Sequence, residues 1–419
     1  MKLKLIHILS PISASVKLST PMLGIPVVAA LTPEYVNIEI EEIIRDQEII
    51  VDTTVDLVAI SVITASSIFG YMISQKYREI GKKVVMGGIH VSLLPDEALN
   101  FCDSVVVGEA ELVWKTVIDD FIEGNLKPLY KASSLCSMNI VPNARLDLLN
   151  LENYYSRAVI HATRGCPYDC KFCSVGKIWG KSYRMRPVNK VIDEIEHMRS
   201  NGTCSNHIFF TDDNLAGNKI FLKTLINEVK ELKITWSAQS NLNIANDKEI
   251  LKLFESSGCI RLYIGIETIS YDSAISMKKT MNDVSKYEDQ IKSLKDAGIM
   301  IQTGLIVGLD EDDEHTFDQI REFAIRNKID IPLVSILTPF IGTDLYNEME
   351  RENRIITKDW SKYDFSTVVF KPKLMSPELL QNKYDELMKD LASISFEGFL
   401  TLNNKVLTHP FSQDYSFSS

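Results

Sequence analysis

Residues 161–173 read HATRGCPYDCKFC and hold three of the chain's seven cysteines, spaced C-x3-C-x2-C. The stretch follows an apolar run at 158–163 that we interpret as a β-strand, so the thiols lie on the loop after that strand. A short loop with glycine and proline at its start can wrap three thiolates around one soft metal centre. Thiolates select iron–sulfur clusters, zinc or Cu(I). The stretch therefore predicts a metal centre at the C-terminal end of a strand.

The number of thiols helps to separate these metals. A structural zinc site closes with a fourth protein ligand. Three thiolates on a cubane cluster leave one iron open, and an open metal position is a site for chemistry. The alternative is that Cys166, Cys170 and Cys173 are three unrelated, buried or redox-inert cysteines. Their density at one strand end favours the metal.

Alternating strands and helices extend from this loop toward the C-terminus. Strands are predicted at 158–163, 207–211, 234–237, 261–266, 301–307 and 334–337. Helices are predicted between them at 188–199, 219–232, 247–256, 284–297 and 314–326. Successive βα units of this kind predict a partial TIM-type (β/α)6 barrel over 158–345, with reactive groups just beyond the strand C-termini.

The region before the barrel shows a second alternation. Strands are predicted at 3–9, 36–40, 57–62, 83–86 and 104–107, and helices at 26–32, 68–80 and 111–123. Continuous apolar runs separated by helices are typical of a parallel sheet covered on both faces. We therefore predict an α/β protein with a Rossmann-like, doubly wound domain at its start. The predicted parts are that domain over 1–135, a linker over 136–157, the barrel, a short α-rich region over 346–411 with a helix at 377–391, and a disordered tail over 412–419.

The composition argues against several classes of protein. Lysine and arginine total 45 against 56 aspartate and glutamate, and the net charge of −11 disfavours binding to nucleic acid. The first residues lack the apolar core and cleavage site of a signal peptide. The most membrane-like stretch, 57–74, is interrupted by serine, threonine and glycine. We expect a cytoplasmic protein with no membrane span and no disulfide framework.

The cysteine loop after the first strand of a βα barrel resembles the signature of the radical S-adenosylmethionine (SAM) enzymes. The resemblance implies that Cys166, Cys170 and Cys173 bind a [4Fe–4S] cluster, whose fourth iron chelates the amino and carboxylate groups of SAM. One-electron reduction then releases a 5′-deoxyadenosyl radical, which abstracts hydrogen from substrate. In this family an aromatic residue before the third cysteine borders the adenine, and Phe172 matches it.

Two further motifs agree with the family. GLIVGLDE at 304–311 matches the pattern G-x-I-x-G-x-x-E, in which Ile306 contacts adenine while Gly304 and Gly308 let a flat ring approach the backbone. A glycine-kinked core strand is the alternative explanation of this motif. Glu267 ends the fourth barrel strand and resembles the family's polar contact to the ribose or amino end of SAM. Gln239, just past the third strand, is a second candidate for the ribose.

The chain departs from the family after the second barrel strand. Many members carry Gly-Gly-Glu there, with the glutamate on the methionyl amine, whereas residues 209–214 read FFTDDN. Asp212 or Asp213 can take that role, and the motif does not say which. The SAM carboxylate calls for a cation, although each candidate is equally compatible with a solvated surface position. These candidates are Arg184, Arg186 and Lys279.

The first domain resembles the cobalamin-binding domains that precede radical SAM barrels. Its paired glycines follow a predicted strand, where a flat or phosphate-bearing ligand can approach the backbone; a tight turn is the alternative. No histidine stands in the D-x-H-x-x-G motif that supplies a lower ligand to cobalt. His90 either approaches the corrin or caps its own turn. The cofactor contacts implied by the resemblance are Ser61, Gly87, Gly88, His90, Gly108 and Glu109.

Residues outside these motifs receive simpler predictions. Trp360, Tyr363 and Asp364 follow the barrel, and we expect them to cover its open side. The remaining cysteines stand alone and are expected to be structural, because free cysteine is usually buried. They are Cys102, Cys136, Cys204 and Cys259.

The combined pattern predicts a cobalamin-dependent radical SAM enzyme that methylates an unactivated carbon. By resemblance, one SAM methylates reduced cobalamin and a second generates the radical, and a flavodoxin- or ferredoxin-type protein donates electrons. One alternative is a radical SAM cyclase, oxidoreductase or rearrangement enzyme in which cobalamin is absent or has a non-methylating role. Another is a non-enzymatic iron–sulfur or zinc adaptor. The substrate stays open among small molecules, lipids and peptides.

Overall fold

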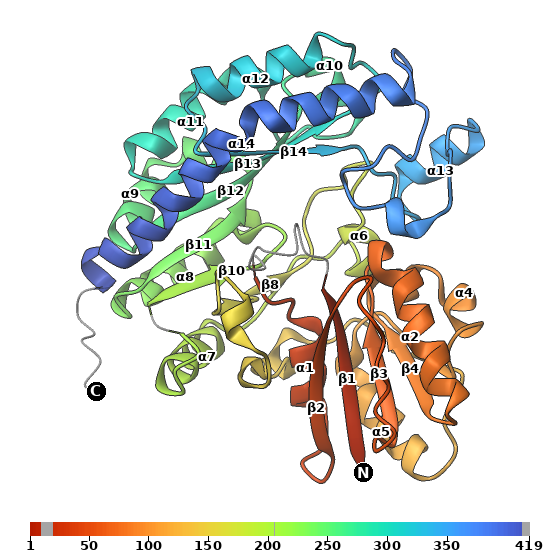
Figure 1. The fold of residues 1–419 in the computed structure, drawn as a ribbon. Helices are drawn as coiled ribbons and strands as arrows, with labels where there is room; N and C mark the ends of the chain where they lie inside the picture. The colour runs from red at the N-terminus through yellow and green to blue at the C-terminus, as the bar shows by residue number, and fades with distance from the viewer. Residues whose placement is uncertain (10–19, 205, 413–419) are drawn as a thin grey trace. The chain divides into compact units, whose positions relative to one another are not determined.

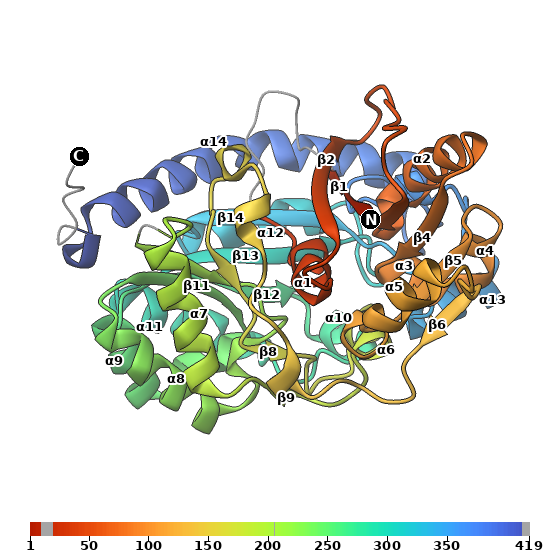
Figure 2. The same cartoon turned by 90° about the horizontal axis from the view of Figure 1, so that it is seen from below.

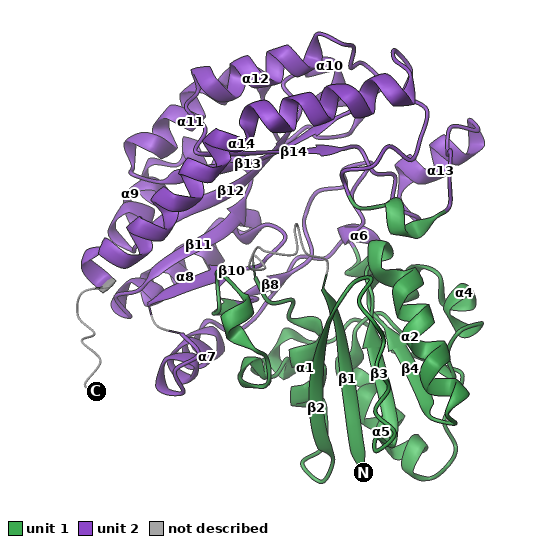
Figure 3. Cartoon of the chain, viewed as in Figure 1, with its two compact units in different colours: residues 1–159, 178–180, 359–364 green, residues 160–177, 181–358, 365–419 purple. Residues whose placement is uncertain are grey.

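A computed structural model describes residues 1–9, 20–204 and 206–412 (Figure 1). The chain divides into two compact units (Figure 3). Unit 1 comprises 1–159 together with two short later segments, 178–180 and 359–364, and unit 2 comprises 160–177, 181–358 and 365–419. From residue 413 onward, the predicted tail lies outside the described residues.

Unit 1 is built on a six-stranded parallel sheet in the order β2-β1-β3-β4-β5-β6. Alternate residues of β1 enter different cores: Ile6 and Ile8 join the core under α2, whereas Leu3 and Leu5 join the core under α1 and α5. Both faces are covered, which explains why the strands are continuously apolar. The strands are β1 (Lys2–Leu9), β2 (Asn37–Ile44), β3 (Leu57–Ser61), β4 (Lys83–Gly87), β5 (Ser104–Val107) and β6 (Leu129–Lys131). The helices are α1 (Gly24–Leu31), α2 (Ser67–Glu79), α3 (Ile89–Leu93), α4 (Pro95–Leu99) and α5 (Trp114–Ile122).

The strand order of unit 1 contains a topological switch point. Strand β1 lies between β2 and β3, so the chain leaves β1 in one direction and returns to build the sheet in the other. In open α/β sheets of this kind, ligands bind outside the carboxyl ends of the strands at the switch point. Ser61 ends β3 beside His7 of β1 and Gly87 of β4, so these residues share that edge.

Unit 2 carries a second six-stranded sheet, in the order β14-β13-β12-β11-β10-β7. Strands β7 and β14 stand at opposite edges, so the barrel is open, as predicted for a partial barrel. Helices α8, α9, α11 and α12 lie along one face of the sheet (Figures 1 and 2). The strands are β7 (Val159–Ile160), β10 (His207–Phe210), β11 (Thr235–Ser240), β12 (Cys259–Glu267), β13 (Met300–Val307) and β14 (Ile331–Ile336). The helices between them are α6 (Val175–Ile178), α7 (Val188–Ser200), α8 (Lys219–Glu231), α9 (Lys248–Ser256), α10 (Tyr271–Ser276), α11 (Tyr287–Asp296) and α12 (Thr316–Arg326).

The C-terminal part adds α13 (Asp344–Arg351) and the long helix α14 (Pro377–Thr408). Helix α14 packs against β14 and α12, and it continues well past the helix predicted at 377–391. Gly398 permits close packing there, because a Cβ would lie 2.0 Å from the carbonyl oxygen of Asp330. No helix in the described residues is both long enough and apolar enough to cross a membrane.

The strand predicted at 158–163 is divided in two. Its first part is β7, and its second part is β8 (Thr163–Arg164), which pairs antiparallel with β9 (Arg184–Met185) away from the barrel sheet. The cause is a side chain: Asp212 accepts hydrogen bonds from the backbone N–H groups of Ala162 and Thr163. The cysteine loop therefore begins from a separate ribbon that a buried carboxylate holds in place.

Two segments between and after the predicted domains pack within unit 1. Residues 136–157 form three short 3-10 helices, η3 (Met138–Ile140), η4 (Leu146–Leu148) and η5 (Leu151–Asn153). In the second segment, which includes η9 (Trp360–Lys362), the Trp360 indole donates to Glu97 Oε2 at 3.1 Å. Trp360, Tyr363 and Asp364 belong to unit 1, and that they cover the open side of the barrel stays a prediction. This packing joins residues 263 positions apart, so no local pattern signals it.

Candidate active site

Three thiols face one pocket of unit 2. Cys166, Cys170 and Cys173 are partly exposed there, whereas the other four cysteines are buried. The rest of the pocket comes from the ends of β10, β11 and β12 and from the segment after α10. Its lining residues are Cys166, Tyr168, Cys170, Phe172, Cys173, Val175, Asp213, Asn214, Gln239, Ser240, Asn241, Tyr263, Gly265, Glu267, Lys279 and Met281.

The spacing of the thiols bears on which metal they suit. The three Sγ atoms do not all lie within 4.8 Å of one another, since the described residues contain only one such group of metal-ligand atoms and it lies elsewhere. A single zinc ion with Zn–S bonds of about 2.3 Å holds its sulfurs closer together than that. A cubane cluster places each thiolate on a different iron and so spreads the sulfurs. The thiol positions therefore do not form a closed single-zinc site among the described residues, and three thiolates on one short loop are a ligand set that a [4Fe–4S] cluster accepts.

The protonation of the thiols points the same way. Burial raises the pKa of all three cysteines, to about 12 for Cys173. The ammonium of Lys279 opposes this shift at Cys166 and Cys170. Buried thiolates need a strongly positive partner, and coordination to a metal deprotonates a thiol outright. Lys279 is one cation against three thiols in the described pocket, so the pocket has the donor set of a metal site.

Two consecutive aspartates have opposite surroundings. The Asp212 side chain is 1% exposed and accepts from the Thr163 hydroxyl as well as from the backbone of the cysteine loop's first residues. Burial raises the pKa of Asp212 to about 7 against these hydrogen bonds. Asp213 lines the pocket, and burial raises its pKa to about 6 against a hydrogen bond from the Gly165 N–H. Asp212 positions the loop, and Asp213 is the carboxyl group that a bound ligand can meet.

Strand β12 presents alternate residues to the pocket. Tyr263, Gly265 and Glu267 line it, whereas Ile264 and Ile266 are fully buried on the other face. Glu267 has a left-handed backbone (φ 67°) as the strand ends, and its Oε1 accepts from Lys279 Nζ at 3.1 Å. Burial opposes the charge of Lys279, but the carboxylate of Glu267 and the sulfur of Cys170 outweigh it and raise the lysine pKa. The pair places one anion and one cation beside the thiols.

The other two predicted cations do not line this pocket. Arg186 is 3% exposed, forms a 2.5 Å ion pair with Glu194 and donates to the carbonyl of His161. Arg184 lies on β9 in the small ribbon. Of the three candidates for the SAM carboxylate, the structure brings only Lys279 to the described cysteine pocket.

The glycine motif on β13 has packing roles in this structure. A Cβ on Gly304 would lie 2.3 Å from the Tyr263 hydroxyl, and a Cβ on Gly308 (φ 90°) would lie 2.8 Å from Leu380 of α14. Ile306 is 9% exposed, and none of the three lines the cysteine pocket. The kinked core strand therefore accounts for these glycines without a ligand, and the adenine contact stays a prediction.

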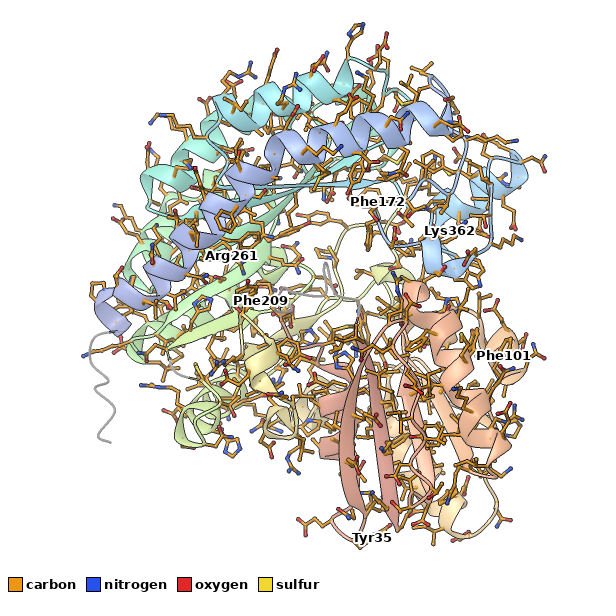
Figure 4. The ribbon with its side chains drawn as sticks, viewed as in Figure 1. Tyr35, Phe101, Phe172, Phe209, Arg261 and Lys362 are labelled. Carbon is orange, nitrogen blue, oxygen red and sulfur yellow. The ribbon has the colours of Figure 1, made fainter. Side chains whose placement is uncertain are left out.

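Several lining residues were not predicted from the sequence. Tyr263 and Asn241 had a signal. Asn241 lies two positions from the predicted Gln239, Tyr263 lies four positions from the predicted Glu267, and side chains of a strand alternate with a period of two. Phe172 is placed as expected on the cysteine loop (Figure 4). Arg261 stands two positions before Tyr263 in the sequence. Its guanidinium lies 5.0 Å from the ring centroid of Phe209 (Figure 4).

Unit 1 has a tight cradle at its switch point. Gly88 has φ 97°, and a Cβ there would lie 2.5 Å from the carbonyl oxygen of Val62 and 2.9 Å from Ser61 Oγ. His7 on the adjacent strand is 3% exposed, and neither ring nitrogen has a hydrogen-bond partner in the described part of the chain. Burial lowers the pKa of His7 to about 4, so the ring is neutral. An orphaned imidazole beside a cradle that only glycine fits is compatible with a bound cofactor, although the sequence motifs did not indicate His7.

The other cobalamin candidates are engaged within unit 1. His90 is fully buried, its N–H contacts the carbonyl of Val62 at 3.4 Å, and its Nε2 lies 3.2 Å from Glu97 Oε1. The His90 ring therefore contacts a carboxylate of α4 and not the backbone of its own turn, and its Nδ1 has no hydrogen-bond partner among the described residues. Gly108 N–H donates to the Ser92 hydroxyl, which donates to the carbonyl of Gly88. Glu109 accepts from the backbone N–H of Cys136.

Known proteins match both units. A family model of the radical SAM superfamily matches residues 160–324, from the barrel's first strand into α12, and a model of the B12 binding domain matches residues 9–118. A bacteriochlorophyllide d C-12(1)-methyltransferase of Chlorobaculum tepidum is 33% identical over 341 residues, or 80% of this chain and 74% of that protein. The chain belongs to the radical SAM superfamily.

Two further comparisons give a second relative and a solved structure with the same fold. A bacteriochlorophyllide d C-8(2)-methyltransferase of the same organism is 30% identical over 376 residues, covering 86% of this chain and 83% of that protein. The structure of the radical SAM methyltransferase TsrM from Kitasatospora setae, with cobalamin and a [4Fe–4S] cluster bound, superposes with a TM-score of 0.69. It covers 94% of this chain and 88% of its own at 14% identity, which shows a shared fold.

Proposed function

We propose that this radical SAM protein is a cobalamin-dependent C-methyltransferase. The observation that carries the proposal is the pocket in which Cys166, Cys170 and Cys173 face Glu267 and Lys279. A B12-type domain precedes this pocket in the chain, and both named relatives are methyltransferases. A [4Fe–4S] cluster supplies the electron that cleaves SAM, and cobalamin carries the methyl group.

The residues of unit 2 divide the binding of SAM among them. Cys166, Cys170 and Cys173 hold the cluster. Asp213 accepts from the methionyl ammonium, since it is the one of the two aspartates that lines the pocket. Lys279 pairs with the methionyl carboxylate, and Glu267 orients Lys279 across their 3.1 Å contact.

The remaining contacts are to the nucleoside. Phe172 borders the adenine, and Gln239, from the neighbouring strand of the same pocket, accepts from or donates to the ribose. Gly304, Ile306 and Gly308 lie outside the pocket lining, so their contact with adenine requires a small rearrangement of Tyr263 over Gly304.

Unit 1 holds cobalamin at its switch point. Ser61, Gly87 and Gly88 form the cradle. The neutral His7 beside it has no hydrogen bond to its ring nitrogens among the described residues, and its Nδ1 lies 4.0 Å from Glu42 Oε1. His90 is a positioning residue that fixes the turn after β4, because its ring is buried against Glu97. Gly108 and Glu109 act in the same way on the loop after β5.

The substrate class follows from the relatives. We propose a chlorin-type small molecule, because both named relatives are bacteriochlorophyllide d methyltransferases that the chain matches over most of their length. A small protein of the flavodoxin or ferredoxin type delivers the electrons.

Anaerobic turnover tests this proposal. The protein is loaded with iron, sulfide and cobalamin, then given dithionite with a viologen mediator, bacteriochlorophyllide d and SAM carrying a deuterated methyl group. We expect S-adenosylhomocysteine and 5′-deoxyadenosine in equal amounts, together with a pigment that has gained the labelled methyl. Formation of 5′-deoxyadenosine with no labelled product and no S-adenosylhomocysteine would instead favour cyclisation, oxidation or rearrangement. The Cys166→Ala variant is the background control.

A further inference from the structure

The inner face of the barrel sheet continues beyond the cysteine pocket toward the N-terminal ends of the strands. Tyr263 of β12 lines the pocket, and Arg261 lies two positions earlier on the same face of the strand. Arg261 is in register with Ser237 of β11, which is in register with Phe209 of β10. On the other side of β12, Gln302 of β13 is in register with Tyr263. We call Phe209, Ser237, Arg261 and Gln302 the barrel floor (Figure 4).

Arg261 is a buried cation that no acidic side chain neutralises. It is 8% exposed, its Nη1 donates to Gln302 Oε1 at 2.8 Å, and its guanidinium lies 5.0 Å from the ring centroid of Phe209. Burial lowers the pKa of Arg261 to about 10, and no aspartate or glutamate of the described residues opposes that shift. The equally buried Arg354, by contrast, pairs with Asp310 at 2.7 Å. A buried charge without a counter-charge is costly, so Arg261 calls for an anion.

The neutral groups around Arg261 do not supply that anion. The His207 ring lies 3.0 Å from the Thr235 hydroxyl and 3.2 Å from the Ser237 hydroxyl. Burial and the charge of Arg261 lower the pKa of His207 to about 3, so this ring is neutral. Burial raises the pKa of the Cys259 thiol well above its usual value, so the thiol is neutral too. The described floor therefore carries one uncompensated positive charge.

The guanidinium has donors left for a ligand. Within the described residues, Nη1 is its one nitrogen with a hydrogen-bond partner, and the buried Nε has none. The edge formed by Nε and Nη2 matches the two oxygens of a carboxylate, which accepts two parallel N–H bonds from an arginine. A phosphate with two charges would call for a second cation, whereas Lys279 in the neighbouring pocket is already paired with Glu267. Phe209 and Tyr263 add aromatic surface for an apolar body.

We propose that Arg261 binds a carboxylate of the substrate at the barrel floor. The proposal rests on the proposed function for the identity of the acid, a chlorin-type molecule, and on the floor for the carboxylate contact. Because Gln302 holds the guanidinium in the row of Tyr263, the bound acid lies next to the cysteine pocket. A contact remote from the reacting carbon fixes which carbon of the substrate faces that pocket.

Removal of the charge from either partner is the test. Arg261→Gln removes it from the protein, and Arg326→Gln is the matched control at an exposed arginine of α12. The probes are bacteriochlorophyllide d as the free acid and as its methyl ester, which removes the charge from the ligand. Hydrocinnamate and its neutral amide form a second pair that is independent of the pigment. Kd values for the pigments and shifts in Tm with the second pair are measured on the anaerobic holoenzyme, and iron content and cluster EPR check its integrity.

We expect the wild type to bind the acid about thirtyfold more tightly than the ester, and Arg261→Gln to lose this preference. The ester should bind Arg261→Gln more tightly than it binds the wild type, because neither partner then leaves a charge unpaired. Hydrocinnamate should raise the Tm of the wild type more than its amide does, and it should not do so in Arg261→Gln. Arg326→Gln should match the wild type throughout. A structural role for Arg261 would instead weaken the acid and the ester equally.

The proposal is overturned if the wild type separates acid from neutral analogue in neither pair, or if Arg261→Gln keeps the separation. If Arg261→Gln loses its iron, Arg261→Lys repeats the test: it keeps the charge without the planar edge and should retain a smaller preference for the acid. Failure of the proposed function appears separately. The pigment then binds in neither form or gains no labelled methyl, while the hydrocinnamate pair still reports on Arg261.

Discussion

The two units share a sheet architecture and differ in the side chains at the carboxyl edges of their sheets. Each has a six-stranded parallel sheet whose carboxyl edge is available for binding. In unit 2 the edge carries thiols, carboxylates and Lys279, because β12 buries one face and presents the other. In unit 1 both faces of β1 enter apolar cores, and the edge carries Gly87, Gly88 and the neutral His7, with Glu42 of β2 4.0 Å from His7. The two carboxyl edges therefore differ in their polar groups: unit 2 presents three thiols and an ion pair, and unit 1 presents glycine backbone and a neutral imidazole.

The strongest way to test this difference is to remove a metal ligand. We expect Cys170→Ala to lose the cluster and all SAM cleavage, because two thiolates do not hold a cubane. Cobalamin content should stay at the wild-type level, since unit 1 folds on its own cores. Iron and sulfide analysis, EPR and corrinoid absorbance measure both. Cys204→Ala, at a buried cysteine outside the pocket, should keep the cluster. Loss of cobalamin along with iron would contradict the separation of the two sites.

The second prediction changes the glycine cradle of unit 1 and leaves the cysteine pocket of unit 2 untouched. Gly88→Ala should lower the free energy of unfolding by about 3 kcal/mol and lower cobalamin content, because the new Cβ meets the Val62 carbonyl in a left-handed turn. Gly124→Ala is the control: it also has positive φ (74°) but nothing within 4 Å, so about 1 kcal/mol is expected. Denaturant unfolding and corrinoid binding measure the effects. Equal costs at the two glycines would refute the clash.

The pH dependence of stability tests the buried carboxyl group behind the cysteine loop. The pKa of Asp212 is raised from the ordinary 3.8 to about 7, so the folded state binds its proton more tightly than the unfolded state. The contribution of Asp212 to the free energy of unfolding is fully present below about pH 4, and it is lost as the pH rises to about 7. In the wild type, the free energy of unfolding should decline by roughly 2–4 kcal/mol across that pH range, and Asp212→Asn should remove this decline. At pH 5 the variant should be less stable by about 1 kcal/mol, because one hydrogen bond is lost. Urea titrations from pH 4 to 8 give both values.

A variant with the same pH slope as the wild type would show that Asp212 titrates normally. Asp96→Asn is the matched control, because it makes the same side-chain change at an exposed position in the first turn of α4, away from the cysteine loop.

The smallest expected effect on stability is at Glu97, the residue that holds the segment 359–364 through Trp360. Glu97 accepts from Trp360 and from the Tyr71 hydroxyl, and it contacts His90. Glu97→Gln should cost about 1–2 kcal/mol and shift the Trp360 fluorescence, with no effect on SAM cleavage driven by dithionite. Glu79→Gln, at an exposed carboxylate that ends α2, should cost almost nothing. Loss of SAM cleavage in the Glu97 variant would mean that unit 1 packing controls the chemistry of unit 2.

The long periodic elements were predictable because burial imposes their pattern locally. The strand predicted at 301–307 appears as β13 (Met300–Val307), and the helix predicted at 219–232 appears as α8 (Lys219–Glu231). The strand at 158–163 was wrong as a single element, because the backbone donors of Ala162 and Thr163 turn to a side chain 50 residues away. Local propensity contains no information about that partner.

The site residues also separate into those that local spacing predicts and those that depend on tertiary packing. The spacing of Cys166, Cys170 and Cys173 predicts a soft metal centre, since ligands to one centre must be close in a short loop. Which of two adjacent aspartates meets the ligand depends on how the strand end turns, and that is decided only by packing around Asp212. Lys279 could not be distinguished from Arg184 and Arg186 until the fold paired Arg186 with Glu194 and brought Lys279 to Glu267.

The sequence by itself determined the two alternating β/α series, the cysteine loop and the family to which they belong, because these are written in short-range patterns of polarity and spacing. The tertiary structure alone decided which side chains share a surface: Asp213 with the thiols, Trp360 with Glu97, and Arg261 with Gln302 at the barrel floor. The physical reason is that these contacts join residues far apart in the chain, and their energy depends on burial and charge that exist only once the sheets have formed.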